Sequence, residues 1–148
     1  MTITELEQLL TEQTADFEII HHSKPIKSRM DALQYFKLEE MAPTLIVKTE
    51  NGFYAVIVSG TREKVDFEIL QRLLNCQQIS MATKEEVLAQ IGMKPGEVAM
   101  VGHHLPCVID ENIFQQQYIY GGAGNARYTL KIRPSDLEKV NQVVQRFN

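Results

Sequence analysis

The chain has 148 residues, which is enough for one domain with a sizeable hydrophobic core. Hydrophobic residues make up 44% and charged residues 23%, a balance that excludes an intrinsically disordered chain. The net charge of −4 and the pI near 5.6 exclude a general attraction to nucleic acid or anionic lipid, so any contact with a polyanion must use a local basic patch.

The N-terminal sequence and the two cysteines indicate the compartment. "MTITELEQLL" has neither a basic start nor a cleavable apolar segment, and no apolar run is long enough to span a bilayer. Cys76 and Cys107 are far apart in the chain, which favours reduced thiols over a disulfide. We therefore expect a cytoplasmic protein without a membrane partner.

The N-terminal part is predicted to form a helix, a strand and a second helix. Thr4 and Glu7 form a capping-box pattern at the start of a short amphipathic helix. Residues 17–20, "FEII", are predicted to form a strand. Ser28 is predicted to cap a helix through residue 36 with three apolar residues along one face: Met30, Leu33 and Phe36.

A β-hairpin is the clearest local signal in the chain. Two β-rich runs, Thr44–Lys48 and Phe53–Val58, are joined through Asn51-Gly52, which supplies the positive φ angles of a hairpin turn. Both runs are apolar at nearly every position. This pattern predicts central strands that are covered on both faces.

The middle of the chain is predicted to contain two more helices. "VDFEILQRLLN" has helical spacing of its apolar residues. Thr83 and Glu86 form a second capping box, and that helix is predicted to stop at Gly92.

The last third is predicted to alternate between strand and helix. "PCVID" and "YIY" are expected to be strands, Gly121-Gly122 to break the chain, and "RYTLKI" to resume as a strand. Ser135 and Glu138 form a third capping box before a closing helix, "DLEKVNQVVQRF". The whole order predicts a single mixed α/β domain over residues 1–148, with helices around a sheet.

The stretch "PGEVAMVGHHLPCVIDENI", residues 95–113, is a candidate wall of a site. Cys107 with His103 or His104 could form a thiol nucleophile and its base, but a cysteine in an apolar strand is more often a core residue. The histidine pairs at 21–22 and 103–104 lack the spacing of a zinc site, so no metal and no other cofactor is predicted.

Glycines and one acid are the more informative residues of this region. Glycine lets a backbone approach a ligand closely, and successive amide groups can bind an anion, although turns also require glycine. Asp110 either caps the turn after its strand or points into a pocket. The glycines that lie around the strand-like segments are Gly96, Gly102, Gly121, Gly122 and Gly124.

Two loose basic clusters could each hold a few phosphates despite the net acidity. A solvated surface is the ordinary alternative for both. The first cluster contains Lys24, Lys27, Arg29 and Lys37, and the second contains Arg127, Lys131 and Arg133.

The order of these segments resembles a known family. "TLIVKTENGFYAVIVSG", "PGEVAMVG", "LPCVID" and "IYGGAGNARYTLKIRPSDL" follow one another as in the YbaK / prolyl-tRNA synthetase-associated editing-domain family, from about His22 to the end of the chain. The resemblance implies a mixed, partly barrel-like sheet flanked by helices. It also implies hydrolysis of a wrong aminoacyl group from tRNA.

The resemblance also implies roles for particular residues. Asp110 matches the family's acid, and Gly121 and Gly122 match the glycine pair at the aminoacyl pocket; these three are the expected catalytic residues. The residues expected to bind the substrate are Gly96, Met100, Gly102, Pro43, Thr44, Arg127 and Lys48.

Two positions depart from the family pattern. Pro43 stands where relatives have a lysine that meets the 3′ end of tRNA, and Met100 stands where they have a proline. Lys48 is offset by an odd number of residues, so on a strand it faces the opposite side from position 43. Lys24, Lys27 or Arg29 could supply the missing charge from another element.

The resulting expectation is a freestanding deacylase that removes alanine, cysteine or serine from mischarged tRNA, with the 3′ acceptor end and a synthetase as partners. In such a reaction, backbone amides stabilise the oxyanion, and Asp110 orients water or binds the substrate's ammonium group. One alternative is a non-catalytic module that binds tRNA or a synthetase. Another is a small-molecule hydrolase that uses Cys107 and a histidine.

Overall fold

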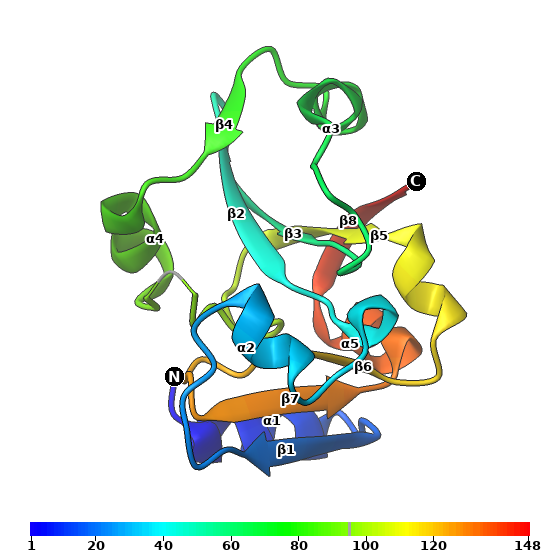
Figure 1. The fold of residues 1–148 in the computed structure, drawn as a ribbon. Helices are drawn as coiled ribbons and strands as arrows, with labels where there is room; N and C mark the ends of the chain where they lie inside the picture. The colour runs from blue at the N-terminus through cyan, green and yellow to red at the C-terminus, as the bar shows by residue number, and fades with distance from the viewer. Residues whose placement is uncertain (95) are drawn as a thin grey trace.

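The structure is a computed structural model that describes residues 1–94 and 96–148, and it has helices packed around two β-sheets (Figure 1). The helices are α1 Ile3–Glu12, α2 Arg29–Leu33, α3 Phe67–Leu74, α4 Lys84–Ile91 and α5 Pro134–Val140, with 3-10 turns η1 Leu38–Glu40 and η2 Glu111–Gln115. The strands are β1 Phe17–His21, β2 Thr44–Thr49, β3 Gly52–Ile57, β4 Ile79–Met81, β5 Pro106–Asp110, β6 Ile119–Gly122, β7 Tyr128–Ile132 and β8 Gln142–Phe147. The mixed α/β class predicted from the sequence is confirmed.

The strands are divided between two sheets and do not form a closed barrel. The smaller sheet has the order β1-β7-β6 and is antiparallel. The larger sheet has the order β4-β2-β3-β5-β8, and its β3–β5 and β5–β8 pairs are parallel. The two sheets meet where Met41 bridges Tyr120 and where the amide of Ala42 donates to the carbonyl of Tyr120 at 2.9 Å.

Each face of the larger sheet buries its own set of apolar side chains. One cluster joins the sheet to α1 and to the smaller sheet, and its members include Leu6, Leu10, Ile109 and Leu130. The other lies beneath α3 and includes Leu70 and Val56. β2 and β3 are therefore central and covered, as the apolar hairpin runs predict.

Several local predictions are confirmed by their hydrogen bonds or bounds. The hairpin of β2 and β3 is confirmed, but its turn residues are Glu50 and Asn51. Gly52 pairs with Thr49 as the first residue of β3, and of the predicted Asn51-Gly52 pair only Gly52 has a positive φ, 118°. Thr83 and Glu86 form the predicted capping box of α4, which ends at Gly92 in the left-handed region. Ser28 caps α2 by accepting a hydrogen bond from the Asp31 amide.

The first two helices differ in detail from the prediction. The capping box of α1 uses Thr2 and Glu5, two residues before the predicted pair. The two pairs have the same spacing, so the sequence pattern alone did not distinguish them. α2 ends at Leu33 instead of reaching residue 36. Its predicted apolar face is not buried, since Met30 is 77% exposed and Leu33 is 45% exposed.

The predictions for the glycine pair and the C-terminus were wrong. Gly121 and Gly122 do not break the chain, because both pair with β7 as part of β6. The closing helix is only α5; Pro134 occupies its first turn, and no side chain caps it. Residues 142–147 form β8, which pairs in parallel with β5, so sheet pairing overrides the helical spacing there.

Among the described residues, no helix is both long and apolar enough to cross a membrane.

The position of β8 leads to a stability prediction. Phe147 is 6% exposed and packs in the cluster beneath α3, whereas the neighbouring Val144 is 47% exposed. We expect Phe147→Ala to lower the free energy of unfolding by about 3 kcal/mol through lost burial and a cavity. Val144→Ala, the matched control, should cost less than about 1 kcal/mol. Urea denaturation measures both, and equal small losses would contradict the packing of β8.

Candidate functional site

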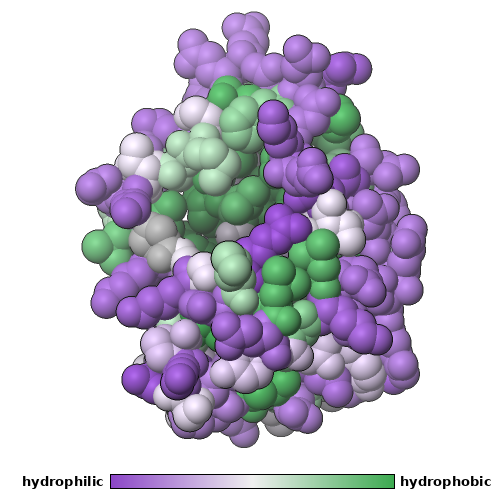
Figure 2. All heavy atoms as spheres, in the orientation of Figure 1, coloured by the Kyte–Doolittle hydropathy of each residue, from purple (hydrophilic) through white to green (hydrophobic). Residues whose placement is uncertain are grey.

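A cavity of about 350 Å³ lies where the two sheets and α2 approach one another. Its wall combines segments that are distant in the sequence. They are residues 26–29 with Ala32 and Phe36, residues 41–45, the loop at 59–62, the loop at 96–98, and parts of 120–129. Figure 2 shows apolar surface gathered in and around a hollow on the face of Figure 1, with hydrophilic residues surrounding it.

The predicted glycine pair lies in the wall of this cavity, together with Gly96. A Cβ atom at Gly121 would lie 2.5 Å from the sulfur of Met100 and 2.6 Å from the carbonyl oxygen of Ala42. A Cβ atom at Gly122 would overlap the carbonyl oxygen of Val98. Only glycine allows the backbone segments to approach this closely, so the pair shapes the pocket by its lack of side chains.

Pro43 and Thr44, at the start of β2, also line the cavity. The hydroxyl oxygen of Thr44 is buried and has no hydrogen-bond partner among the described residues. An unpaired buried hydroxyl costs free energy unless a ligand or water satisfies it. Thr44 is therefore a candidate contact for a polar group of a ligand.

Four of the expected substrate-binding residues do not line the cavity. Met100 is fully buried behind Gly121, and Gly102 faces the side chain of Met1. Arg127 donates through Nη1 to the carbonyl of Ser23 at 2.6 Å. Lys48 forms an ion pair with Glu86 of α4, with 2.6 Å between the atoms.

The basic residues of the wall come from the first predicted cluster and from one residue outside it. Lys27 and Arg29 both line the cavity, whereas Lys24 does not. Arg29 also donates through Nη2 to the carbonyl of Gly60 at 2.8 Å. Arg62, the residue outside the cluster, reaches the wall from the loop after β3.

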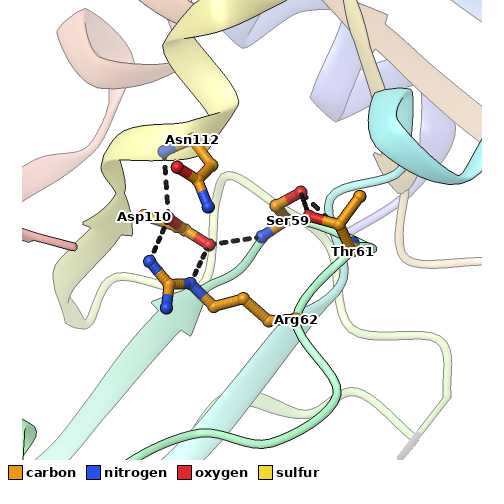
Figure 3. A network of polar contacts seen from close by, with 5 residues as sticks. All are labelled: Ser59, Thr61, Arg62, Asp110 and Asn112. Atoms are coloured by element: carbon orange, nitrogen blue, oxygen red, sulfur yellow. Dashed lines mark hydrogen bonds and ion pairs between the residues drawn. The ribbon is translucent and has the colours of Figure 1, made fainter.

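Asp110 is fully buried and holds this loop in place (Figure 3). Its two oxygens accept hydrogen bonds from Nε and Nη2 of Arg62, at 2.5 and 2.9 Å, and from the amides of Ser59 and Asn112, each at 2.9 Å. The Asn112 bond makes Asp110 the cap of η2. Asp110 is outside the cavity wall, and of its two predicted roles the structure shows the cap.

The hydrogen bonds of Asp110 also determine its pKa. Burial alone raises the pKa of this carboxyl group, but the bonds from Arg62 and from the two backbone amides outweigh burial, so the pKa lies below the ordinary value of 3.8. The guanidinium group of Arg62 additionally lies 4.9 Å from the centre of the Phe147 ring. The loop that carries Ser59 and Arg62 is therefore tied both to the end of β5 and to β8.

The arrangement does not support a thiol nucleophile at Cys107. The side chain is fully buried, and burial raises the pKa of its thiol to about 12. His103 is also buried, which lowers its pKa to about 4, and its Nδ1 accepts the amide hydrogen of Leu105. In the described part of the chain, no group of three or more metal-binding side chains comes together.

Sequence reasoning missed the aromatic and polar part of the wall. The rings of Phe36 and Tyr120 stack with centroids 4.6 Å apart, and both line the cavity. His22 is buried beside them and shares a 2.8 Å hydrogen bond with the hydroxyl of Thr129. The wall also contains Tyr128, Asn125 and Glu97. The alternation of Tyr120 and Gly122 along one strand could have indicated that both residues face the cavity. The stacking of Phe36 on Tyr120 could not be predicted in this way, because Phe36 comes from a distant turn.

Comparison with known proteins identifies the family to which this chain belongs. Residues 23–140 match the family described as the aminoacyl-tRNA editing domain, and the chain belongs to this family. The chain is 28% identical over 119 residues to the proline–tRNA ligase of Thermosipho melanesiensis, covering 78% of this chain and 21% of the ligase. It is 31% identical over 85 residues to the proline–tRNA ligase of Bacillus subtilis, covering 56% of this chain and 15% of the ligase. The chain thus spans about a fifth of the length of these ligases or less.

Solved structures share the fold over nearly the whole chain. A crystal structure of a hypothetical protein superposes with a TM-score of 0.85 at 22% identity, covering 96% of this chain and 97% of that one. A crystal structure of a candidate trans-editing enzyme for prolyl-tRNA synthetase superposes with a TM-score of 0.84 at 23% identity, covering 97% and 94%. At these identities, the two structures establish the fold.

The close contact at Gly122 can be tested by adding one methyl group. We expect Gly122→Ala to lower the free energy of unfolding by about 2 kcal/mol, because the added carbon meets backbone that cannot rotate away. Thermal and urea unfolding measure the loss. Wild-type stability in this variant would contradict the contact with the carbonyl of Val98.

The Asp110–Arg62 ion pair predicts a large effect of removing one charge. Asp110→Asn leaves Arg62 without its partner, and we expect a loss of about 2–3 kcal/mol, at the low end for a broken buried pair because the Arg62 side chain is 22% exposed. Urea denaturation at pH 7 measures this loss. Asp16→Asn is the matched control, because Asp16 pairs with Arg133 at an exposed site, where solvent screens the charges, and it should cost much less than Asp110→Asn.

The same pair predicts a dependence on pH. Because the folded-state pKa of Asp110 is lowered, its contribution to stability is complete above about pH 4 and is lost as the pH falls through the folded-state value. The free energy of unfolding of Asp110→Asn should therefore fall less steeply than that of the wild type on acidification below pH 4. Parallel curves for the two proteins would contradict the ion pair.

Proposed function

We propose that the chain hydrolyses the ester bond of a mischarged aminoacyl-tRNA and removes a small amino acid of the alanine, cysteine or serine class. Membership of the aminoacyl-tRNA editing domain family carries this proposal. A cavity of about 350 Å³ is at the small end of ligand sites, which suits an aminoacyl group attached to a terminal ribose.

The proposed reaction needs no nucleophilic side chain. A water oxygen attacks the ester carbonyl carbon, and the negative charge moves to the carbonyl oxygen. When the tetrahedral intermediate collapses, the bond from this carbon to the ribose oxygen breaks. The ribose oxygen takes one proton of the water, and the other proton passes to solvent. The amino acid leaves as a carboxylate that contains the water oxygen and the former carbonyl oxygen. Backbone amides around Gly96, Gly121 and Gly122 would stabilise the oxyanion, as fixed donors do in other acyl transfers.

We further propose that Lys27 takes the part of the lysine that Pro43 replaces. Lys27 is exposed at the cavity wall, where it can meet the phosphates at the 3′ acceptor end of tRNA. Arg29 is the second cation of this segment, although one of its donors is already used by Gly60. Thr44, with its unpaired hydroxyl, would contact the terminal ribose or the attacking water.

In this proposal, Asp110 acts as a positioning residue. Its four hydrogen bonds keep Ser59 and Arg62 at the cavity wall and leave neither oxygen for water. Because both oxygens of Asp110 already accept hydrogen bonds and Pro43 replaces the family lysine, one other candidate function is favoured. It is a module that binds the tRNA acceptor end or prolyl-tRNA synthetase without catalysis. The two candidates predict the same binding but different turnover.

The test is deacylation of alanyl-, cysteinyl- and seryl-tRNA by the wild type, Pro43→Lys, Lys27→Met and Lys24→Met. We expect wild-type turnover of at least one of these tRNAs. Lys27→Met should lose about five- to tenfold in kcat/KM, and its log-log salt slope should become shallower by about 1, because one phosphate contact is removed. Lys24→Met, the matched control outside the cavity wall, should retain both values.

Two results would decide against this assignment. Turnover only in Pro43→Lys would mean that the wild-type pocket is intact but lacks an essential positive charge. Lys27 would then not take the part of the family lysine. Binding of tRNA without turnover by any variant would establish the binding module.

A further inference from the structure

Glu97 is the one acidic residue among the described residues of the cavity wall. It lies on the loop between α4 and β5, is partly buried, and its amide donates to the carbonyl of Lys94 at 2.9 Å. The next residue, Val98, lies against Gly122, and the amide of Met100 donates to the carbonyl of Gly122 at 3.0 Å. Glu97 is therefore held beside the glycine pair.

The other charged groups of the wall are all cationic: Lys27, Arg29 and Arg62. Arg62 is neutralised by Asp110, but the positive charges of Lys27 and Arg29 make binding of a positively charged ligand group at the wall unfavourable. An aminoacyl ester carries such a charge on its α-ammonium group. A substrate of this kind needs a negative group close to its amino acid.

Asp110, the acid that the sequence suggests for this purpose, is not free to bind an ammonium group. Each of its oxygens accepts two hydrogen bonds from within the chain, and its side chain is fully buried outside the wall. A carboxylate has about four acceptor positions, so the capacity of Asp110 is used up. The requirement for a negative group falls on Glu97.

We propose that Glu97 binds the α-ammonium group of the aminoacyl ester and so selects substrates whose amino group is free. This inference rests on the proposed function, because it names the part of the substrate that one side of the pocket recognises. An N-blocked aminoacyl group has no positive charge and loses this contact. Glu97 acts in binding, and the acyl-transfer step stays as described above.

The test uses binding, so it does not depend on turnover. The probes are 3′-alanylamino-3′-deoxyadenosine, whose amide bond resists hydrolysis, and its N-acetyl derivative. Calorimetry or NMR titration gives Kd for the wild type, Glu97→Gln, Glu97→Asp and Glu63→Gln. Glu63→Gln is the matched control, since Glu63 is exposed and outside the cavity wall.

We expect the wild type and Glu63→Gln to bind the free amine about three- to tenfold more tightly than the N-acetyl probe, the range for a partly exposed ionic contact. Glu97→Gln should lose this preference, and Glu97→Asp should keep part of it. Equal affinity of the wild type for both probes would overturn the inference, as would an unchanged preference in Glu97→Gln or no binding of either probe. Deacylation by the wild type, measured separately, decides the proposed function whichever of these results is obtained.

Discussion

The pocket depends on the close backbone approach at the end of β6. Gly121 lies against the carbonyl of Ala42, and Gly122 lies against the carbonyl of Val98. Two hydrogen bonds reinforce this junction, from Ala42 to Tyr120 and from Met100 to Gly122. The pair thus joins the smaller sheet to the segment before β2 and to the loop before β5, which are two separate parts of the cavity wall. A side chain at either glycine would move these segments apart.

The Asp110–Arg62 ion pair fixes another part of the pocket wall, the loop that carries Ser59 and Arg62. It joins the end of β5 to the loop after β3. β3 and β5 are neighbouring parallel strands of the larger sheet. Removing both charges from water is costly, and the four hydrogen bonds to Asp110 offset that cost. The stacking of Arg62 on Phe147 adds β8 to the same assembly. Burial and hydrogen bonding therefore make this carboxylate part of the scaffold.

What the sequence predicts well is local. The hairpin of β2 and β3 and the capping box of Thr83 with Glu86 depend on residues within a few positions of one another, and both are confirmed. The C-terminal strand was missed because its structure depends on pairing with β5, more than thirty residues earlier in the chain. Gly121 and Gly122 could be assigned to the pocket by resemblance, but whether Asp110 faces the pocket or caps a turn depends on Arg62, whose proximity no local pattern indicates.

The distribution of charge links the scaffold to the proposed chemistry. A chain with a net charge of −4 has no general attraction for tRNA, so in the proposed function a local group of cations near the cavity supplies the attraction, and Arg62 of that group is already neutralised. In the proposed complex, Lys27 and Arg29, which line the cavity, would face the phosphates, and Glu97 would face the positively charged amino acid. The 3′ end of an aminoacyl-tRNA carries negatively charged phosphates on one side of the ester and a positively charged ammonium group on the other. The proposed contacts would orient the ester between the cations and Glu97. Orientation matters more than affinity here, since the reaction needs the ester carbonyl beside the glycine amides.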